Sequence, residues 1–302
     1  MKERTMARDF KNLKFGVNIH TGIRPGVDPL AEALHAEQLG FDIVTLHGDV
    51  LHGSDPSFEL WTLLTWVAAS TSRIRVAPVV LALPNRHPAV LAKMAETLDR
   101  LSGGRLILVL GAGGPMNEPA YKAFGLAQRS PREKVQALEE AIDTLRGLWS
   151  TSGFSYAGQY FRTEEATIEP RPGHPIPLWL GVFGTQMLDL VGRKADGWLP
   201  TYQFLEPEEA YQKLEHIRAV AEQAGRNPDE FTYAYNVPVL VEEGAITNRW
   251  RVAGSARKVA RQLTTMVRHG FTFVNVWPVG EATIQRERLA RDVLPIVRDL
   301  LA

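Results

Sequence analysis

The sequence predicts an α/β fold, a single (β/α)8 TIM barrel that occupies residues 1–302, on three observations. Short apolar runs alternate with amphipathic segments along the whole chain, about eight of each, and eight βα units close a parallel barrel. The length of 302 residues is within the range of one large α/β barrel. Hydrophobic residues make up 45% and charged residues 23%, so the chain can bury a substantial core.

The candidate strands are the short apolar runs. Runs of this kind, alternating with helical segments, are typical of a parallel sheet built from successive βα units. They occupy residues 13–19, 42–46, 74–80, 106–110, 177–181, 197–201, 231–240 and 271–277.

The candidate helices are the amphipathic segments between these runs. Three of them open with a proline that follows Asp28, Ser130 or Glu206, and proline suits a first turn because its missing N–H is not needed there. Gly40 and Gly270 each stand where a left-handed cap would turn the chain into the next strand. The predicted helices span residues 29–39, 58–70, 88–101, 131–148, 185–194, 207–224, 255–268 and 282–301.

One segment, residues 150–175, breaks the alternation. It is long, contains three glycines and carries two aromatic pairs. We interpret it as a β-hairpin insertion between the fourth and fifth βα units. A doubly wound dinucleotide-binding fold is the alternative, but the glycine-rich run at 111–118 lacks a glycine at Met116, and we expect Pro115 and Pro119 to obstruct a helix there.

Composition excludes several classes of function. Lys+Arg and Asp+Glu are 34 each, so no overall field attracts nucleic acid or an acidic membrane surface. With no cysteine the chain has no disulfide, no thiolate nucleophile and no cysteine metal site, which suits a reducing cytoplasm. No apolar stretch is long enough for a secretory signal or a membrane span, and the scattered histidines predict no metal site.

In a (β/α)8 barrel the working residues lie at the carboxyl ends of the strands and in the loops that follow. The polar and glycine-rich residues at these places are Asn18 and His20, His47 and Asp49, residues 78–84, 111–118 and 181–185, Tyr202 and Gln203, Asn236, and the aromatic residues Trp198 and Trp277. A glycine-rich run after a strand can also be simply a flexible loop, and spacing alone leaves both interpretations open.

Several runs resemble the luciferase-like enzymes that use flavin or deazaflavin. They are Arg86-His87-Pro88, Thr97-Leu98-Asp99-Arg100-Leu101-Ser102-Gly103-Gly104-Arg105, Leu110-Gly111-Ala112-Gly113, Pro175-Ile176-Pro177-Leu178-Trp179-Leu180-Gly181 and Ala195-Asp196-Gly197-Trp198. The resemblance extends over roughly residues 15–273 and keeps the family's order.

The resemblance implies where a ring cofactor binds. A non-proline cis peptide or bulge at the end of the third strand backs the ring, and Pro78-Val79 matches that place, although proline there can also be an ordinary strand terminator. The order of Gly111, Gly113, Asn117 and Glu118 is similar to that of enzymes using the deazaflavin coenzyme F420, and Gly181 ends the fifth strand. Gly114 stands where several of those enzymes carry a glutamate proton donor.

Two helix starts are candidates for the cofactor phosphate. Gly184 and Thr185, which match the family's phosphate loop, are preferred, because helix N-terminal amides bind anions. The second is the run 254–258, with Arg257 and Lys258 near a cofactor tail and Ser255 equally explained as an N-cap. His47 and Asp49 are the candidate catalytic residues, since histidine titrates near neutral pH, but a purely structural hydrogen bond explains His47 equally well.

The function expected from the resemblance is F420-dependent hydride transfer to or from a small organic substrate. The alternatives are an FMN-dependent monooxygenase that uses reduced flavin and oxygen, and a cofactor-binding barrel without turnover, which Gly114 suggests. An aldolase is a third, but the only lysine on a candidate strand, Lys14, lies at the wrong end. We expect a cytoplasmic homodimer with no nucleic-acid or membrane partner.

Overall fold

The strands close into a parallel barrel in the computed structural model, which describes residues 13–48 and 56–302. Around the barrel the order is β1, β2, β3 with β4, β5, β8, β9, β10 and β12, and β12 pairs with β1. The bounds are Lys14–Ile19, Ile43–Leu46, Arg75–Pro78, Leu81–Ala82, Leu108–Gly111, Leu178–Leu180, Gly197–Trp198, Thr232–Val241 and Phe273–Pro278. The predicted barrel is therefore confirmed.

The third strand position is divided between two short strands. β3 pairs with β2, whereas β4 pairs with β5. Val76 closes the ring between β3 and the run that leads into β5, because its N–H donates to Arg105 O and its carbonyl accepts from Ile107 N, both at 3.0 Å. An additional strand, β11 (Val252–Gly254), pairs with β10 outside the ring order.

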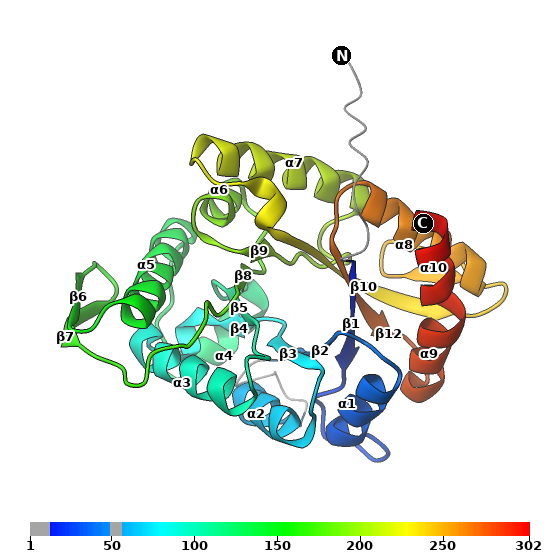
Figure 1. Ribbon diagram of the computed structural model, residues 1–302, viewed down its shortest axis with the longest axis horizontal. Helices are drawn as coiled ribbons and strands as arrows, with labels where there is room; N and C mark the ends of the chain where they lie inside the picture. Colours follow the sequence, from blue (N-terminus) through cyan, green and yellow to red (C-terminus); the bar gives the residue numbers. More distant parts are fainter. Residues whose placement is uncertain (1–12, 49–55) are drawn as a thin grey trace.

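The helices surround the strands, as Figure 1 shows. They are α1 (Pro29–Gln38), α2 (Leu60–Ser70), α3 (Pro88–Leu101), α5 (Pro131–Ser150), α6 (Thr185–Lys194), α7 (Pro207–Gln223), α8 (Ala256–Arg268), α9 (Ala282–Arg288) and α10 (Leu294–Leu301). The capping predictions hold for Asp28, which accepts from Leu30 N and Ala31 N, and for Ser130, which forms a capping box with Glu133. Glu206 precedes its helix without a side-chain cap bond.

The last predicted helix, 282–301, is not continuous. A π-helical turn over Leu289–Val293 separates α9 from α10. Pro295, at the start of α10, has no N–H to give to the preceding turn, and the wider turn accommodates that loss.

A second difference concerns the loop after β5. A 3-10 turn at Pro115–Asn117 and the short helix α4 (Glu118–Ala123) do form there, so the expected obstruction by proline was wrong. Both prolines stand in first turns, where no amide is required.

The segment 150–175 contains β6 (Phe154–Ala157) and β7 (Arg162–Ala166), paired antiparallel. They lie beyond α5, on the outside of the helix layer, at the left of Figure 1. Glu140 on α5 accepts hydrogen bonds from the backbone of Gln159, Tyr160 and Phe161 at 2.8–3.0 Å. Lys93 and Arg100 on α3 donate to backbone carbonyls further along the segment, so both helices hold it against the barrel.

Candidate active site

The carboxyl ends of β1, β2 and β3 end at one level. Ile19 pairs with Leu46, and Leu46 pairs with Pro78, so the residues that follow, His20, His47 and Val79, start the mouth of the barrel together. The Thr21 hydroxyl donates to His47 O at 2.7 Å, which fixes the first loop to the end of β2. Strand ends at one level are the arrangement in which barrels build active sites.

The chain between β3 and β4 holds a cis peptide bond between Val79 and Val80. It lies one peptide further along than the predicted pair, Pro78-Val79. Side chains alternate along a strand, and Ala77 faces the barrel interior, so Pro78 faces the helices instead. Val79 and Val80 pack on the inner apolar cluster. At the end of β3 it is therefore Val79 and Val80, and not Pro78, that line the interior.

Val80, which follows the third strand, packs against the ends of the fourth and fifth strands. A Cβ atom built on Gly111 would lie 2.5 Å from Val80 Cγ2, and one built on Gly181 would lie 2.4 Å from Val80 Cγ1. Real Cβ atoms do not approach so closely, since carbon atoms prefer about 3.5–4.0 Å. Glycine at both positions thus lets Val80 lie flat across the inner floor of the mouth.

The fourth-strand loop continues this floor. Gly113 has φ +89°, a conformation that favours glycine, and a Cβ there would lie 3.0 Å from Pro84 and 3.2 Å from Tyr121. Asn117 follows at the start of α4, and its amide donates to the Tyr121 hydroxyl at 3.4 Å. Glu118 points away to an ion pair with Lys134 at 2.8 Å.

The two candidate phosphate sites differ in how their helices are capped. Gly184 is the N-cap of α6 and provides no side-chain bond, and Gly184 and Thr185 are exposed. Ser255 caps α8 by accepting from Lys258 N. Because the first amides of a helix have no partner within it, α6 presents donors to an anion, whereas α8 already satisfies one of its own.

A belt of buried polar side chains crosses the other half of the barrel interior. Asn275 Nδ2 donates to Thr45 Oγ1 and to Asn236 Oδ1, both at 2.8 Å. Asn236 in turn donates to Thr201 at 3.4 Å, and Thr45 donates to Asn18 Oδ1 at 3.3 Å. The mouth therefore has a polar side on β1, β2, β10 and β12, and an apolar side on β3, β5 and β8.

This belt was only partly expected. Asn18, near the end of the first predicted strand, and Asn236, within the seventh, were candidates, but Thr45 and Asn275 were missed because each lies inside an apolar run. A polar residue at an inward position of such a run is the signal that could have found them.

The predicted catalytic pair is only partly described. The His47 ring lies against Trp277, with ring centroids 4.5 Å apart, which confines the imidazole to the mouth. Asp49 lies outside the described residues.

A buried ionic cluster at the end of β1 was not anticipated. Glu32 on α1 accepts from His20 N at 3.0 Å and contacts His20 Nδ1 at 3.1 Å, and Arg286 on α9 lies 3.1 Å from the same carboxylate. Burial alone would raise the pKa of Glu32, but the hydrogen bonds from His20 and the charge of Arg286 outweigh it and hold the pKa below 4.5. Glu32 is therefore ionised at neutral pH.

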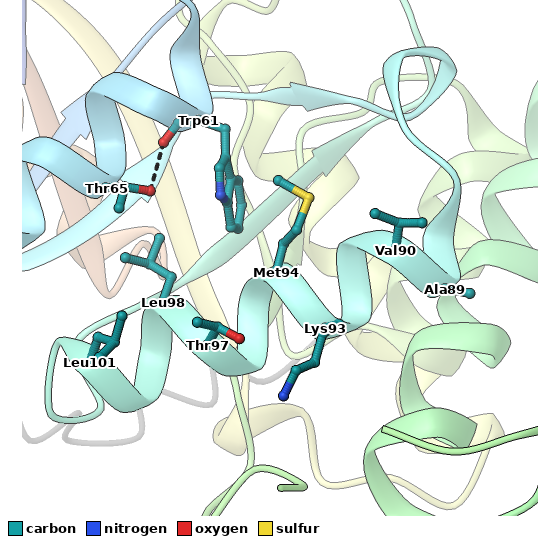
Figure 2. Close-up of a pocket in the computed structure, with 9 residues that line it drawn as sticks. All are labelled: Trp61, Thr65, Ala89, Val90, Lys93, Met94, Thr97, Leu98 and Leu101. Atoms are coloured by element: carbon teal, nitrogen blue, oxygen red, sulfur yellow. Dashed lines mark hydrogen bonds between the residues drawn. The ribbon is translucent and has the colours of Figure 1, made fainter. Parts of the chain in front are cut away.

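An apolar groove of about 620 Å³ lies elsewhere, on the outside of the barrel between α2 and α3. Figure 2 shows Trp61 and Thr65 of α2 facing Met94 and Leu98 of α3 across it.

Within the described residues, no His, Asp and Glu side chains gather in a group of three or more that could hold a metal ion. Over the same residues, no helix is long and apolar enough to cross a membrane.

Comparison with known proteins adds two curated relatives. An F420-dependent glucose-6-phosphate dehydrogenase of Kineococcus radiotolerans is 34% identical over 175 residues, which are 56% of this chain and 50% of the relative. A phthiodiolone/phenolphthiodiolone dimycocerosates ketoreductase of Mycobacterium tuberculosis is 36% identical over 203 residues, 65% of this chain and 50% of the relative. The chain thus spans about half the length of these relatives.

The fold and a family model extend further along the chain. A solved structure of an F420-dependent secondary alcohol dehydrogenase in complex with an F420-acetone adduct has a TM-score of 0.83 and 18% identity, covering 95% of this chain and 99% of the other. This likeness shows the fold. Residues 15–245 match the model of the family described as luciferase-like monooxygenase. The resemblance expected from the sequence is confirmed, and the chain belongs to the luciferase-like monooxygenase family.

Proposed function

We propose that the chain is an oxidoreductase that binds coenzyme F420 and transfers a hydride to or from a small organic substrate. The observation that carries the proposal is the convergence of three turns on Val80, which brings the ends of the third, fourth and fifth strands to one side of the mouth. A ring cofactor with a phosphorylated tail requires such a convergence, because its parts must contact all three turns at once. The name of the Kineococcus relative, an F420-dependent dehydrogenase, supports the choice of cofactor.

The residues present fit this cofactor. Val79 and Val80 supply an apolar surface for one face of a planar ring. Gly113 keeps the backbone close at one edge, where a side chain would meet Pro84 and Tyr121. Gly184 and Thr185 leave the first amides of α6 available to the phosphate. We assign Asn117, at the start of α4, to the ring edge.

When bound, F420 supplies the hydride acceptor or donor, and the chain supplies orientation and electrostatics. We place the substrate over the polar side of the mouth, where His47 and Trp277 lie above the Thr45–Asn275 pair. An oxygen-bearing substrate suits this side, because a carbonyl or hydroxyl group needs hydrogen-bond partners where an apolar surface offers none.

Cofactor retention tests the proposal. The purified protein is incubated separately with F420 and with FMN, passed through a desalting column, and the absorbance of the eluted protein is recorded. We expect F420 to be retained and then reduced on addition of either glucose 6-phosphate or 2-propanol, which represent phosphorylated sugars and secondary alcohols. Retention of FMN alone would favour the monooxygenase alternative, and F420 retention without turnover of any alcohol or carbonyl compound would favour the non-catalytic barrel. Retention of neither would overturn the assignment.

The expected homodimer is also a proposal, and the α2–α3 groove supports it. Val90 and Leu101, which line the groove, are 57% and 78% exposed, and Trp66 on α2 is 61% exposed, which is unusual for large apolar side chains. Two copies of the chain related by a twofold axis could each insert these exposed side chains into the groove of the other copy, because a twofold axis brings the same surface of both copies together. The cytoplasmic location and the single-domain organisation stay predictions.

A further inference from the structure

The ionic cluster at the end of β1 has the composition of a proton-transfer site. Glu32 binds His20 through Nδ1 and through the backbone N–H, and these two bonds fix both the position of the residue and the orientation of its ring. The Arg286 side chain, only 2% exposed, lies against Glu32 and donates to Thr283 Oγ1 at 3.3 Å. A carboxylate that orients an imidazole through one nitrogen is the arrangement that makes the other nitrogen an effective base.

The second ring nitrogen of His20 is the available one. Glu32 is ionised and can only accept, so the neutral His20 ring must carry its proton on Nδ1, which leaves Nε2 with a lone pair. The side chain is 26% exposed, and among the described residues no hydrogen bond engages Nε2.

His20 lies at the mouth, at the level of the proposed cofactor floor. It follows Ile19 on β1, and the aligned pairs Ile19–Leu46 and Leu46–Pro78 place it level with Val79, two strands away. Neighbouring strands are about 4.8 Å apart, so the backbones of His20 and Val79 are separated by about 10 Å. A small substrate lying over the cofactor ring would fill the space between His20 and Val79.

We propose that His20 is a catalytic residue that exchanges a proton with the substrate oxygen, with Glu32 and Arg286 as positioning residues. This role rests on the proposed F420-dependent reaction, which supplies the hydride acceptor. In alcohol oxidation the substrate O–H bond breaks and its proton forms an N–H bond at Nε2. The carbinol C–H bond breaks with its electron pair, which leaves as hydride to the coenzyme, and a C=O bond forms. Carbonyl reduction moves the same atoms in reverse.

A purely structural role for the cluster, as a tie between α1 and α9, is the competing explanation. The chain offers a matched control in His35, which lies one turn further along α1 and contacts Glu287 at 3.5 Å through Nε2. Glu32 from α1 contacts His20, Arg286 from α9 contacts Glu32, and His35 and Glu287 form a second pair between the same two helices. His35 has the same type of partner as His20 and a similar exposed fraction, 23% against 26%, but it stands on α1 and not at the end of β1.

The first measurement needs no turnover. A long-range proton–nitrogen NMR spectrum of the ¹⁵N-labelled protein, with His20 assigned from His20→Gln, reports which nitrogen carries the proton. We expect the neutral ring to be protonated on Nδ1, and Glu32→Gln to relax that preference because a carboxamide can donate as well as accept. A ring protonated on Nε2, or an imidazolium throughout the pH range of activity, would overturn the proposal.

The second measurement uses the loaded enzyme with whichever of glucose 6-phosphate and 2-propanol it oxidises. His20→Gln should lower kcat by about 100-fold or more and remove one ionisation from the pH profile, with KM and F420 affinity unchanged. Imidazole in the buffer should partly restore His20→Ala, whereas His35→Gln should behave as wild type. Equal losses in the His20 and His35 variants, or no rescue, would mean a structural role. Failure to retain F420 would overturn the proposed function itself, whereas retention with the wrong tautomer would overturn only the role of His20.

Discussion

Replacing Gly111 by alanine should destabilise the barrel through a single contact. The new Cβ would lie 2.5 Å from Val80 Cγ2, about 1 Å short of the optimal carbon–carbon separation. The next nearest atoms are 3.6 and 3.8 Å away, so Val80 is the only obstacle. Overpacking of this kind costs about 1–3 kcal/mol of unfolding free energy, because the valine must leave its position on the inner floor. The same displacement should weaken F420 binding.

A double-mutant cycle isolates that contact. Val80→Ala removes both methyl groups, so Gly111→Ala should cost at least about 1 kcal/mol less in the Val80→Ala background than in the wild type. Urea unfolding at neutral pH gives the unfolding free energy of all four proteins. Titration with F420 gives the cofactor affinity of each, which reports on the position of Val80. Gly114→Ala in the same loop is the control, since a Cβ there meets nothing within 4 Å, and its cost should stay below about 0.5 kcal/mol. Additive effects of the two substitutions would refute the argument.

The remaining predictions concern the anion site, the acid stability and the surface. Gly184→Asp should leave unfolding free energy within a few tenths of a kcal/mol but weaken F420 at least about tenfold, because a carboxylate would occupy the α6 amides; a deazaflavin without phosphate should bind as before. Burial alone would raise the pKa of Glu37, but hydrogen bonds from the backbone N–H groups of Ile74 and its two predecessors hold it below 4.5. That contribution is present above pH 4.5 and lost as the pH falls through the lowered value. Glu37→Gln should therefore cost about 1 kcal/mol in urea unfolding at pH 7 and less at pH 3, and an equal cost at both would contradict this. Trp66→Glu with Leu101→Lys should convert a dimer to a monomer in light scattering, while a wild-type monomer would exclude the pairing.

The elements that follow from local periodicity could be predicted from the sequence. Strand and helix patterns repeat over a few residues, and the prolines after Asp28 and Ser130 mark helix starts without any tertiary information. The division of the third strand into β3 and β4 could not be read in this way, since both parts belong to one apolar run. The same limit explains α4, where the prolines were judged as breakers although they begin turns.

The residues of the candidate site also fall into those that the sequence could predict and those that it could not. Gly111, Gly113, Gly181 and Gly184 could be identified from the resemblance, because the family keeps them in order along the chain. The belt could not, since Thr45 and Asn275 are 230 residues apart and meet only because the barrel closes. Glu32 and Arg286 meet for the same reason, and nothing near either residue in the sequence indicates a partner.

The Glu32–Arg286 pair also has a consequence for the order in which the chain assembles. During synthesis α1 leaves the ribosome long before residue 286 is added. Glu32 is therefore present in an incomplete barrel without Arg286, its cationic partner. A buried carboxylate without its counter-charge is strongly unfavourable, so we expect the first βα units to pack fully only when α9 is present. A chain shortened before α9 should accordingly be less rigid around α1 than the full chain.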